Sequence, residues 1–128
     1  MSKQTQPRRL ADNEAQAVLR TVKSSAQKAR LVLDMIRGLP VEKALAELTF
    51  SKKAIARDAK KLLESAIANA ENNHNLDVDK LVVSKTFADK SIVMKRWRAR
   101  ARGRVGKILK PRCHMTVVVG EKQTEEKA

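Results

Sequence analysis

Aromatic side chains are scarce in this chain of 128 residues, which has no tyrosine, one tryptophan (Trp97) and two phenylalanines (Phe50 and Phe87). Modules that read single-stranded RNA stack unpaired bases on several aromatic rings. The composition therefore argues against such a module and favours contacts with the phosphates and the shape of a folded nucleic acid. Trp97 itself is compatible with packing within a hairpin, with a membrane-interface position and with stacking on a base or ribose.

Cysteine and long apolar runs are also scarce. The single cysteine, Cys113, excludes an internal disulfide and is compatible with a reducing compartment. No apolar run approaches the roughly 20 residues that a bilayer span requires. The N-terminal MSKQTQPRRLADNEAQ lacks the apolar stretch of a secretory signal. We therefore expect a cytoplasmic protein with no membrane partner.

Acidic residues are missing from one long segment. Between Lys90 and Gly120 there are ten lysines or arginines and no aspartate or glutamate. The whole chain has a formal net charge of +14 and a pI near 10.4. Ordinary solvated surfaces mix both signs of charge, and unrelieved like charge destabilises a compact state. The segment therefore predicts a polyanionic partner, with nucleic acid ahead of an anionic membrane surface.

The residues that carry reactive chemistry do not form a catalytic set. Cys113 and His114 are neighbours in a stretch with strand alternation, so their side chains point to opposite faces, and a buried core thiol is favoured over a nucleophile. One cysteine and two histidines (His74 and His114) are too few for a structural zinc site. GRVGK at 103–107 lacks the spacing of a phosphate-binding loop and its following Ser or Thr. We expect a protein that is not an enzyme and that needs no metal or cofactor.

The first part of the chain has helical periodicity after a polar start. Residues 1–17 are interpreted as a flexible basic arm, and 18–23 as one short strand. SSAQKARLVLDMIRGLP predicts a helix that Ser24 or Ser25 caps and that ends before Gly38. VEKALAEL at 41–48 predicts a second helix, and Ser51 is expected to cap a third that runs to about residue 73.

These helices are expected to bury three apolar stripes and to leave cations outside. The stripes are Ala29, Val32, Leu33 and Ile36, then Val41, Ala44, Leu45 and Leu48, then Ile55, Ala59, Leu62, Leu63, Ala66, Ile67 and Ala70. Lys28 and Arg30 lie outside the first stripe, and Lys52 and Lys53 lie on the outer side of the third helix. These four cations are free to face a partner.

After Leu81 the period changes to two, and LVVSKTF and CHMTVVV predict strands. The five arginines between them fall on every second residue from Arg96 to Arg104, which places them on one side of an extended chain with Trp97, Ala99, Ala101 and Gly103 on the other. We therefore expect a β-hairpin over 81–119, with its tip at about 94–104 and its turn near 98–102. Residues 121–128 are interpreted as a flexible tail.

The expected hairpin is long for its body. Each arm of about eighteen residues would extend roughly 60 Å, whereas the rest of the chain should form a body only about 30 Å across. The fold class is thus α+β, with three helices packed on a small antiparallel sheet and a protruding hairpin, in one domain over 18–120. The outer half of the hairpin has no core to pack against, so we expect its tip to be mobile until phosphates replace its counterions.

Three stretches resemble the L22 family of bacterial large-subunit ribosomal proteins: SSAQKARLVLDMIRG, KKLLESAIANAENN and the pattern from Lys95 through RARGR to HMTVVV. The family signature is a basic residue, four residues, Arg-small-x-Gly-basic, nine residues, and His with alternating aliphatics. Here Lys95, the segment from Arg100 to Arg104, and His114 with its following aliphatics match it. The resemblance covers about 18–120. This chain departs from the family at Trp97, where an aliphatic is common, and at Ala99, where proline is common.

The resemblance implies a body on the outer surface of the large subunit and a hairpin that penetrates 23S ribosomal RNA and lines the nascent-peptide exit tunnel. It implies a role early in subunit assembly. The implied partners are 23S ribosomal RNA, neighbouring large-subunit proteins and the nascent polypeptide, without self-association. Residues expected to face the tunnel are Trp97, Arg98, Ala99 and Arg100. Residues expected to contact RNA are Lys23, Ser25, Lys28, Arg30, Lys52, Lys53, Lys95, Arg96, Arg98, Arg100, Arg102, Arg104, Lys107, Lys110 and Arg112.

The main alternative is an architectural DNA-binding protein whose basic β-arm wraps a minor groove. A helix-turn-helix is less well supported, because the outer face of the third helix is mostly lysine and offers few base-reading side chains. A membrane-active cationic protein is disfavoured because the cationic segment lacks an apolar face at helical spacing.

Overall fold

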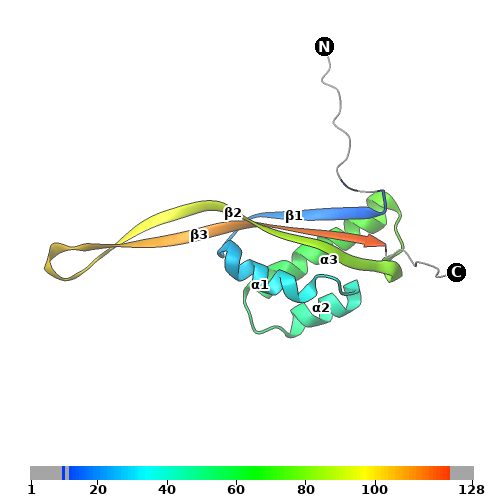
Figure 1. The fold of residues 1–128 in the computed structure, drawn as a ribbon, viewed down its shortest axis with the longest axis horizontal. Helices are drawn as coiled ribbons and strands as arrows, with labels where there is room; N and C mark the ends of the chain where they lie inside the picture. The colour runs from blue at the N-terminus through cyan, green and yellow to red at the C-terminus, as the bar shows by residue number, and fades with distance from the viewer. Residues whose placement is uncertain (1–9, 11, 122–128) are drawn as a thin grey trace, which may run out of the picture.

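The computed structural model describes residue 10 and residues 12–121. The elements follow the order β1 (Glu14–Val22), α1 (Ala26–Ile36), α2 (Val41–Phe50), α3 (Ile55–His74), β2 (Leu81–Ala99) and β3 (Val105–Glu121), with short 3-10 turns at Val78–Lys80 and Ala101–Gly103. The strands form an antiparallel sheet in the order β1-β3-β2. The helices lie on one face of this sheet, and β2 and β3 continue far beyond them as a projecting hairpin (Figure 1). The predicted α+β fold is confirmed.

Helix α1 forms where its local signals predict it. The Ser25 Oγ accepts a hydrogen bond from the Lys28 N–H at 3.3 Å and caps the helix. The predicted stripe is buried in full, and Ala26 joins it. Gly38 follows the helix with φ of +84°, which favours glycine. Its N–H donates to the Val83 carbonyl at 2.7 Å, so the end of α1 is fastened to β2.

The predicted cap of the third helix is wrong. Helix α2 continues to Phe50, two residues past its predicted end, and Ser51 is the residue that follows it. The Ser51 Oγ accepts from the Lys53 N–H at 3.4 Å in the turn between the helices, and α3 begins only at Ile55 without a side-chain cap. A capping residue must lie immediately before the first helical turn. Because α2 is longer than predicted, Ser51 lies at the C-terminal end of α2, and it is too far from Ile55 to cap α3.

Helix α3 buries a narrower stripe than predicted. Ala59, Leu62, Leu63, Ala66 and Ala70 are buried as expected, and Ala56 joins them. Ile55 and Ile67, and Leu45 of α2, are only partly buried against the core. Asn75 ends α3 in the left-handed conformation with φ of 51°, as the asparagine-rich sequence there predicts.

Strand β1 begins at Glu14, four residues before the predicted strand, and ends at Val22. Residues 14–17 therefore belong to the sheet and not to the expected flexible arm. Glu14 pairs with Gly120, while Ala15 and Ala17 are buried. Strand β3 is also longer than predicted. It includes Glu121, which the sequence analysis assigned to the tail. Residues 1–9 and 11 of the arm and 122–128 of the tail lie outside the described residues.

The core lies between the helices and the sheet. The largest fully buried side chains include Leu33 and Ile36 of α1, Leu63 of α3, and Leu81 and Met115 of the strands. None of the helices among the described residues has the length and apolarity that a membrane span requires.

The hairpin leaves this core abruptly. Ala88 on β2 and Cys113 on β3 are its last buried residues, at 3% and 0% exposure. From there to the turn β2 runs for about another ten residues, which is roughly 33 Å of strand. Among the described residues, this outer hairpin makes its backbone hydrogen bonds only within itself. Its order therefore depends on its own strand pairing and on what surrounds it.

Candidate nucleic-acid interface

The strand register sorts the outer hairpin into two faces. The ladder continues without a break from the Val93–Pro111 pair to the Ala99–Val105 pair. Because side chains alternate and paired residues share a face, one face carries Val93, Lys95, Trp97, Ala99, Val105, Lys107, Leu109 and Pro111. The other face carries Met94, Arg96, Arg98, Gly106, Ile108 and Lys110. Cations thus lie on both faces; Trp97, Leu109 and two valines lie on the first face, and Met94 and Ile108 lie on the second.

The predicted row of five arginines on one side does not persist. Arg96 and Arg98 share a face opposite Trp97 and Ala99, as expected. The turn then begins at Arg100, two residues later than predicted, and Arg102 has φ of 59° inside it. The Arg100 N–H donates to the Arg104 carbonyl at 2.7 Å and closes the turn. Arg102 lies within the turn and Arg104 lies at its end, just before β3. The five arginines therefore do not form a single row on one face.

Two contacts organise the side chains near this turn. Gly106 lies beneath the Arg100 side chain, and a Cβ at this position would come within 3.3 Å of the Arg100 Nε. The absence of a side chain at Gly106 therefore lets Arg100 fold back over the strand. The Lys107 Nζ lies 5.6 Å from the centroid of the Trp97 ring, across the ladder from it. This cation–π contact covers one part of a ring that is 62% exposed.

Within the described part of the chain, no ion pair neutralises the hairpin cations. The Asp34–Arg37 pair, at 3.5 Å, lies at the C-terminal end of α1 and involves none of them. The lysines and arginines from Lys90 to Lys110 are exposed, and Arg112 is partly buried. Their positive charge is left facing solvent.

The body brings three predicted contact residues from separate elements around one hollow. A cavity of about 660 Å³ is lined by Lys23 after β1, Lys28 of α1 and Lys53 before α3. Leu31 and Ile55 give it an apolar wall, and Asp58 is its one acidic residue. The N-terminal ends of α1 and α3 both meet this cavity, and such helix ends carry partial positive charge.

A second cavity lies where α1 meets the base of the hairpin. It measures about 690 Å³ and brings together Ser25, Arg30 and Arg112, which the sequence predicted as contacts. Lys90 also lines it, although sequence reasoning did not select this residue. The available signal was its place at the start of the segment that lacks acidic residues. Lys52 and the remaining predicted contacts lie outside both cavities.

Arg30 has a structural role that the sequence did not reveal. Its Nε and Nη2 donate to the Ala88 carbonyl at 3.2 and 2.9 Å. Ala88 is the last buried residue of β2 before the hairpin leaves the body. Two residues later the β2–β3 register shifts between Lys90 and Val93. Arg30 therefore fastens α1 to the strand just before this irregularity.

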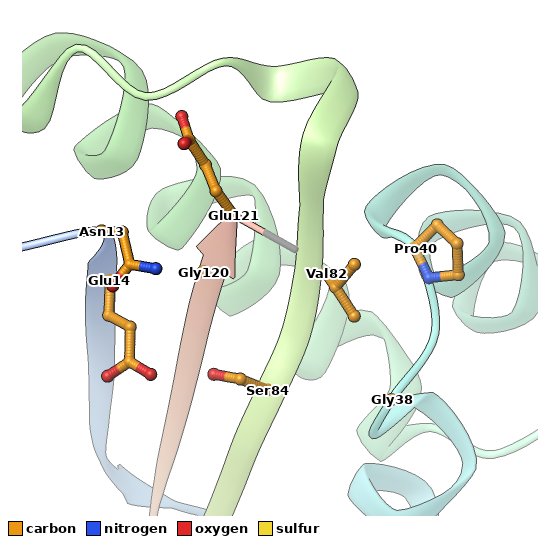
Figure 2. Close-up of a pocket in the computed structure, with 8 residues that line it drawn as sticks. All are labelled: Asn13, Glu14, Gly38, Pro40, Val82, Ser84, Gly120 and Glu121. Carbon is orange, nitrogen blue, oxygen red and sulfur yellow. The ribbon is translucent and has the colours of Figure 1, made fainter. Parts of the chain in front are cut away.

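The opposite end of the sheet has the opposite electrostatic character. A smaller cavity of about 260 Å³ there is lined by Glu14 and Glu121 with uncharged neighbours. The two carboxylates point away from each other, on either side of Gly120 (Figure 2). Glu121 Oε1 accepts from the Asp77 N–H at 2.8 Å. Within the described residues no three possible metal ligands gather at one point. Two carboxylates thus lie at the end of the sheet away from the hairpin, whose own charged residues beyond Lys90 are all cationic.

These features define a small basic α+β protein with a projecting cationic hairpin arm. A family model described as ribosomal protein L22p/L17e matches residues 17–120. The chain is 62% identical over 126 residues to the large ribosomal subunit protein uL22 of Jannaschia sp. (strain CCS1), covering 98% of each. It is 61% identical to that of Maricaulis maris (strain MCS10), covering 94% of this chain and 96% of the relative. It is 59% identical to that of Ruegeria sp. (strain TM1040), with full coverage of both.

The chain therefore belongs to the L22 family of ribosomal proteins, as the sequence resemblance predicted. Membership makes it a constituent of the large ribosomal subunit, which in bacteria is cytoplasmic.

Proposed function

We propose that this chain is a non-catalytic component that binds 23S ribosomal RNA through two regions. Its body holds RNA phosphates at the two cavities beside α1, and its hairpin passes between RNA segments to the nascent-peptide exit tunnel. The observation that carries the proposal is the outer hairpin itself, which projects beyond the core with its cations exposed and, among the residues that the structure describes, without ion pairs.

Electrostatics explains why such a hairpin needs RNA. Charges about 7 Å apart on one strand face repel by roughly 0.6 kcal/mol per pair in water. That is comparable with the roughly 0.2–1 kcal/mol that a good cross-strand pair contributes. Phosphates placed among Arg96, Arg98 and Lys110 turn this repulsion into attraction, and the released counterions drive binding. The RNA therefore stabilises an extended shape that the protein alone favours only weakly.

The same reasoning applies to the body. Lys23, Lys28 and Lys53 lie close to helix N-termini, where positive side chains are unfavourable because the helix dipole is also positive there. A phosphate in this cavity would attract both the lysines and the positive helix ends, and it would offset the repulsion between them. Arg30, Lys90 and Arg112 offer a second set of cations at the base of the hairpin. Phosphates bound there would fix the direction in which the hairpin leaves the body.

The tunnel role follows from the position of the tip. Trp97, Arg98, Ala99 and Arg100 are exposed and lie near the far end of the hairpin. Once RNA surrounds the strands, only such an end remains free to meet a polypeptide that passes by. An early role in assembly follows as well, because a hairpin of this length is most easily placed before the RNA segments close around it.

A salt titration tests the RNA-binding mechanism. If about eight phosphates are neutralised, the logarithm of affinity for 23S RNA fragments should fall with the logarithm of salt concentration at a slope near −7, taking −0.9 per contact. A slope near zero would exclude the mechanism. Crosslinking from position 100 in intact ribosomes should reach both RNA and nascent chain, and a tip that reaches neither would remove the tunnel proposal.

The DNA-bending alternative loses support at the tip. Arms of that class insert an apolar wedge between base pairs, whereas the turn from Arg100 to Arg104 contains three arginines, one alanine and one glycine. Competition between ribosomal RNA and duplex DNA of equal length separates the two functions. Equal or stronger binding to DNA would favour the alternative.

A further inference from the structure

The pairing of β1 with β3 is interrupted at one place. Leu19 pairs with Met115 and Val22 pairs with Cys113, so Arg20 and Thr21 together lie opposite the single residue His114. This is the arrangement of a β-bulge, in which one strand carries an extra residue and bends. Thr21 has φ of 57°, a left-handed conformation that is exceptional for a β-branched residue. Something in the surroundings must hold it there.

The side chain of His114 supplies that support. The Thr21 N–H donates to the His114 Nδ1 at 3.0 Å. In a regular ladder such an N–H would bond to a carbonyl of the neighbouring strand, but a bulge leaves the extra residue unpaired. The imidazole nitrogen takes the place of the missing carbonyl. Because a backbone N–H is always a donor, Nδ1 must be the unprotonated nitrogen, and the ring proton must lie on Nε2.

The bulge controls how the chain passes from β1 into α1. Val22 returns to the core at 4% exposure, the Ser24 N–H bonds to the Val22 carbonyl at 2.8 Å, and α1 begins at Ala26. Lys23 therefore lies two residues after Thr21, at the point where the chain leaves β1. It lines the 660 Å³ cavity with Lys28 and Lys53. The conformation at Thr21 thus decides where Lys23 and the start of α1 lie.

We infer that His114 is a positioning residue for RNA binding: its Nδ1 holds the Thr21 bulge and thereby sets Lys23 and the α1 N-terminus at the phosphate-binding cavity. The inference rests on the proposed RNA-binding function for its consequence, but the hydrogen bond at its centre does not. A proton on Nδ1 would place one donor against another, so the bulge requires this nitrogen to remain an acceptor.

Charged groups of both neighbouring strands lie near His114. Asp89 lies directly across the ladder on β2. Arg20 lies within the bulge on β1, and Arg112 lies two residues back along β3. The helices pack against the other face of the sheet, since the buried neighbours Cys113 and Met115 point that way.

Two substitutions separate the nitrogen atoms of the ring. In His114→Asn the amide oxygen can occupy the position of Nδ1 and accept from Thr21, whereas the amide of His114→Gln reaches the position of Nε2. We expect the asparagine variant to keep the Thr21 amide resonance at its wild-type position and to keep the wild-type affinity for 23S RNA fragments. The glutamine and alanine variants should lose that resonance position and bind about threefold to tenfold more weakly, the worth of one hydrogen bond.

Nitrogen spectra of the wild-type imidazole should show an unprotonated Nδ1 and a proton on Nε2, as the bond from Thr21 requires. If glutamine preserves affinity and asparagine does not, the histidine acts through Nε2 on RNA and the inference is overturned. It is equally overturned if the alanine variant keeps the native Thr21 resonance. If wild-type protein fails to bind ribosomal RNA while the Thr21 amide still responds as expected, the RNA function fails and the bulge assignment stands.

Discussion

Cys113 occupies the boundary between the body and the hairpin, and its side chain is fully buried. Desolvation by burial raises the pKa of this thiol above its ordinary value. Only the thiolate is nucleophilic, so a buried neutral thiol is inert. The fold therefore protects the one cysteine of the chain and makes it a reporter of unfolding.

We expect iodoacetamide to alkylate Cys113 in the native protein roughly a thousandfold more slowly than in denaturant, because only the opened fraction reacts, on the order of one molecule in a thousand or fewer. The pKa is raised in the folded state, so the unfolded chain ionises first as pH rises. The free energy of unfolding should therefore decline above about pH 8.5. The Cys113→Ala variant should lack this part of the decline. Rapid native alkylation at neutral pH would contradict the burial.

Gly103 and Gly106 show which single-residue features could be predicted. The sequence indicated a turn near the arginine cluster, but it placed that turn two residues too early. A positive φ at Gly103 and room for the Arg100 side chain over Gly106 are properties of the paired strands. They depend on the register, and alternation alone does not specify the register because it fits several turn positions equally well.

Helix α1 joins the two parts of the molecule through Arg30, whose guanidinium bonds to the Ala88 carbonyl. We expect Arg30→Ala to lower the free energy of unfolding by about 1 kcal/mol or less, because the bond is only partly buried. Amide exchange around residues 88–90 should accelerate more than exchange at the centre of the sheet.

Arg37→Ala on the same helix is the matched control for this change. It removes the exposed ion pair with Asp34, which should contribute at most about 0.5 kcal/mol, and it leaves the hairpin base intact. Equal effects of the two substitutions on exchange at 88–90 would show that Arg30 does not fasten the hairpin.

One face of the outer hairpin presents Arg96 and Arg98 together, and their effect on RNA binding should be measurable as a change in salt dependence. Replacing both by glutamine should make the salt slope less negative by about 1.8, or 0.9 for each lost phosphate contact. Lys43→Gln with Lys80→Gln removes the same charge from exposed positions outside the described cavities. That pair should leave the slope nearly unchanged. A similar change in both double variants would mean that only net charge matters.

The elements themselves were predictable to the extent that their signals are local. Ser25, the apolar stripe and Gly38 lie within a few turns of one another, so α1 could be located accurately. The start of β1 depends on pairing between Glu14 and Gly120, more than a hundred residues apart, and polar composition concealed it. Ser51 was misassigned because two helices compete for it. Local patterns contain no information on such competition.

The cavities were beyond prediction for a related reason. Lys28 and Lys53 were selected as cations outside an apolar stripe, and Lys23 was named only among the expected RNA contacts. Their gathering around one hollow depends on how α1 and α3 pack, and periodicity does not determine that packing. The same holds for Arg30, whose bond to β2 joins residues 58 positions apart. Charge could be read from the sequence, but its arrangement could not.

The molecule combines a packed body with an outer hairpin that has no core. In free protein, amides of the inner ladder, at 81–88 and 113–119, should exchange slowly because the helices cover one side of those strands. Amides at 93–99 and 105–111 should exchange at least about a hundredfold faster, since a two-stranded ribbon alone is marginally stable in water.

RNA binding should reduce this difference in amide exchange rate between the inner ladder and the outer hairpin. When a 23S RNA fragment binds, counterion release and phosphate contacts stabilise the outer hairpin. Amide exchange at 93–99 should therefore slow toward that of the inner ladder. Inner-ladder amides serve as the internal control, because their protection comes from the body and should change little. Raising salt in the complex should reverse the protection of the arm before that of the body. If the arm is already protected without RNA, and RNA adds nothing, then the strands hold their own shape and the electrostatic account of this protein is wrong.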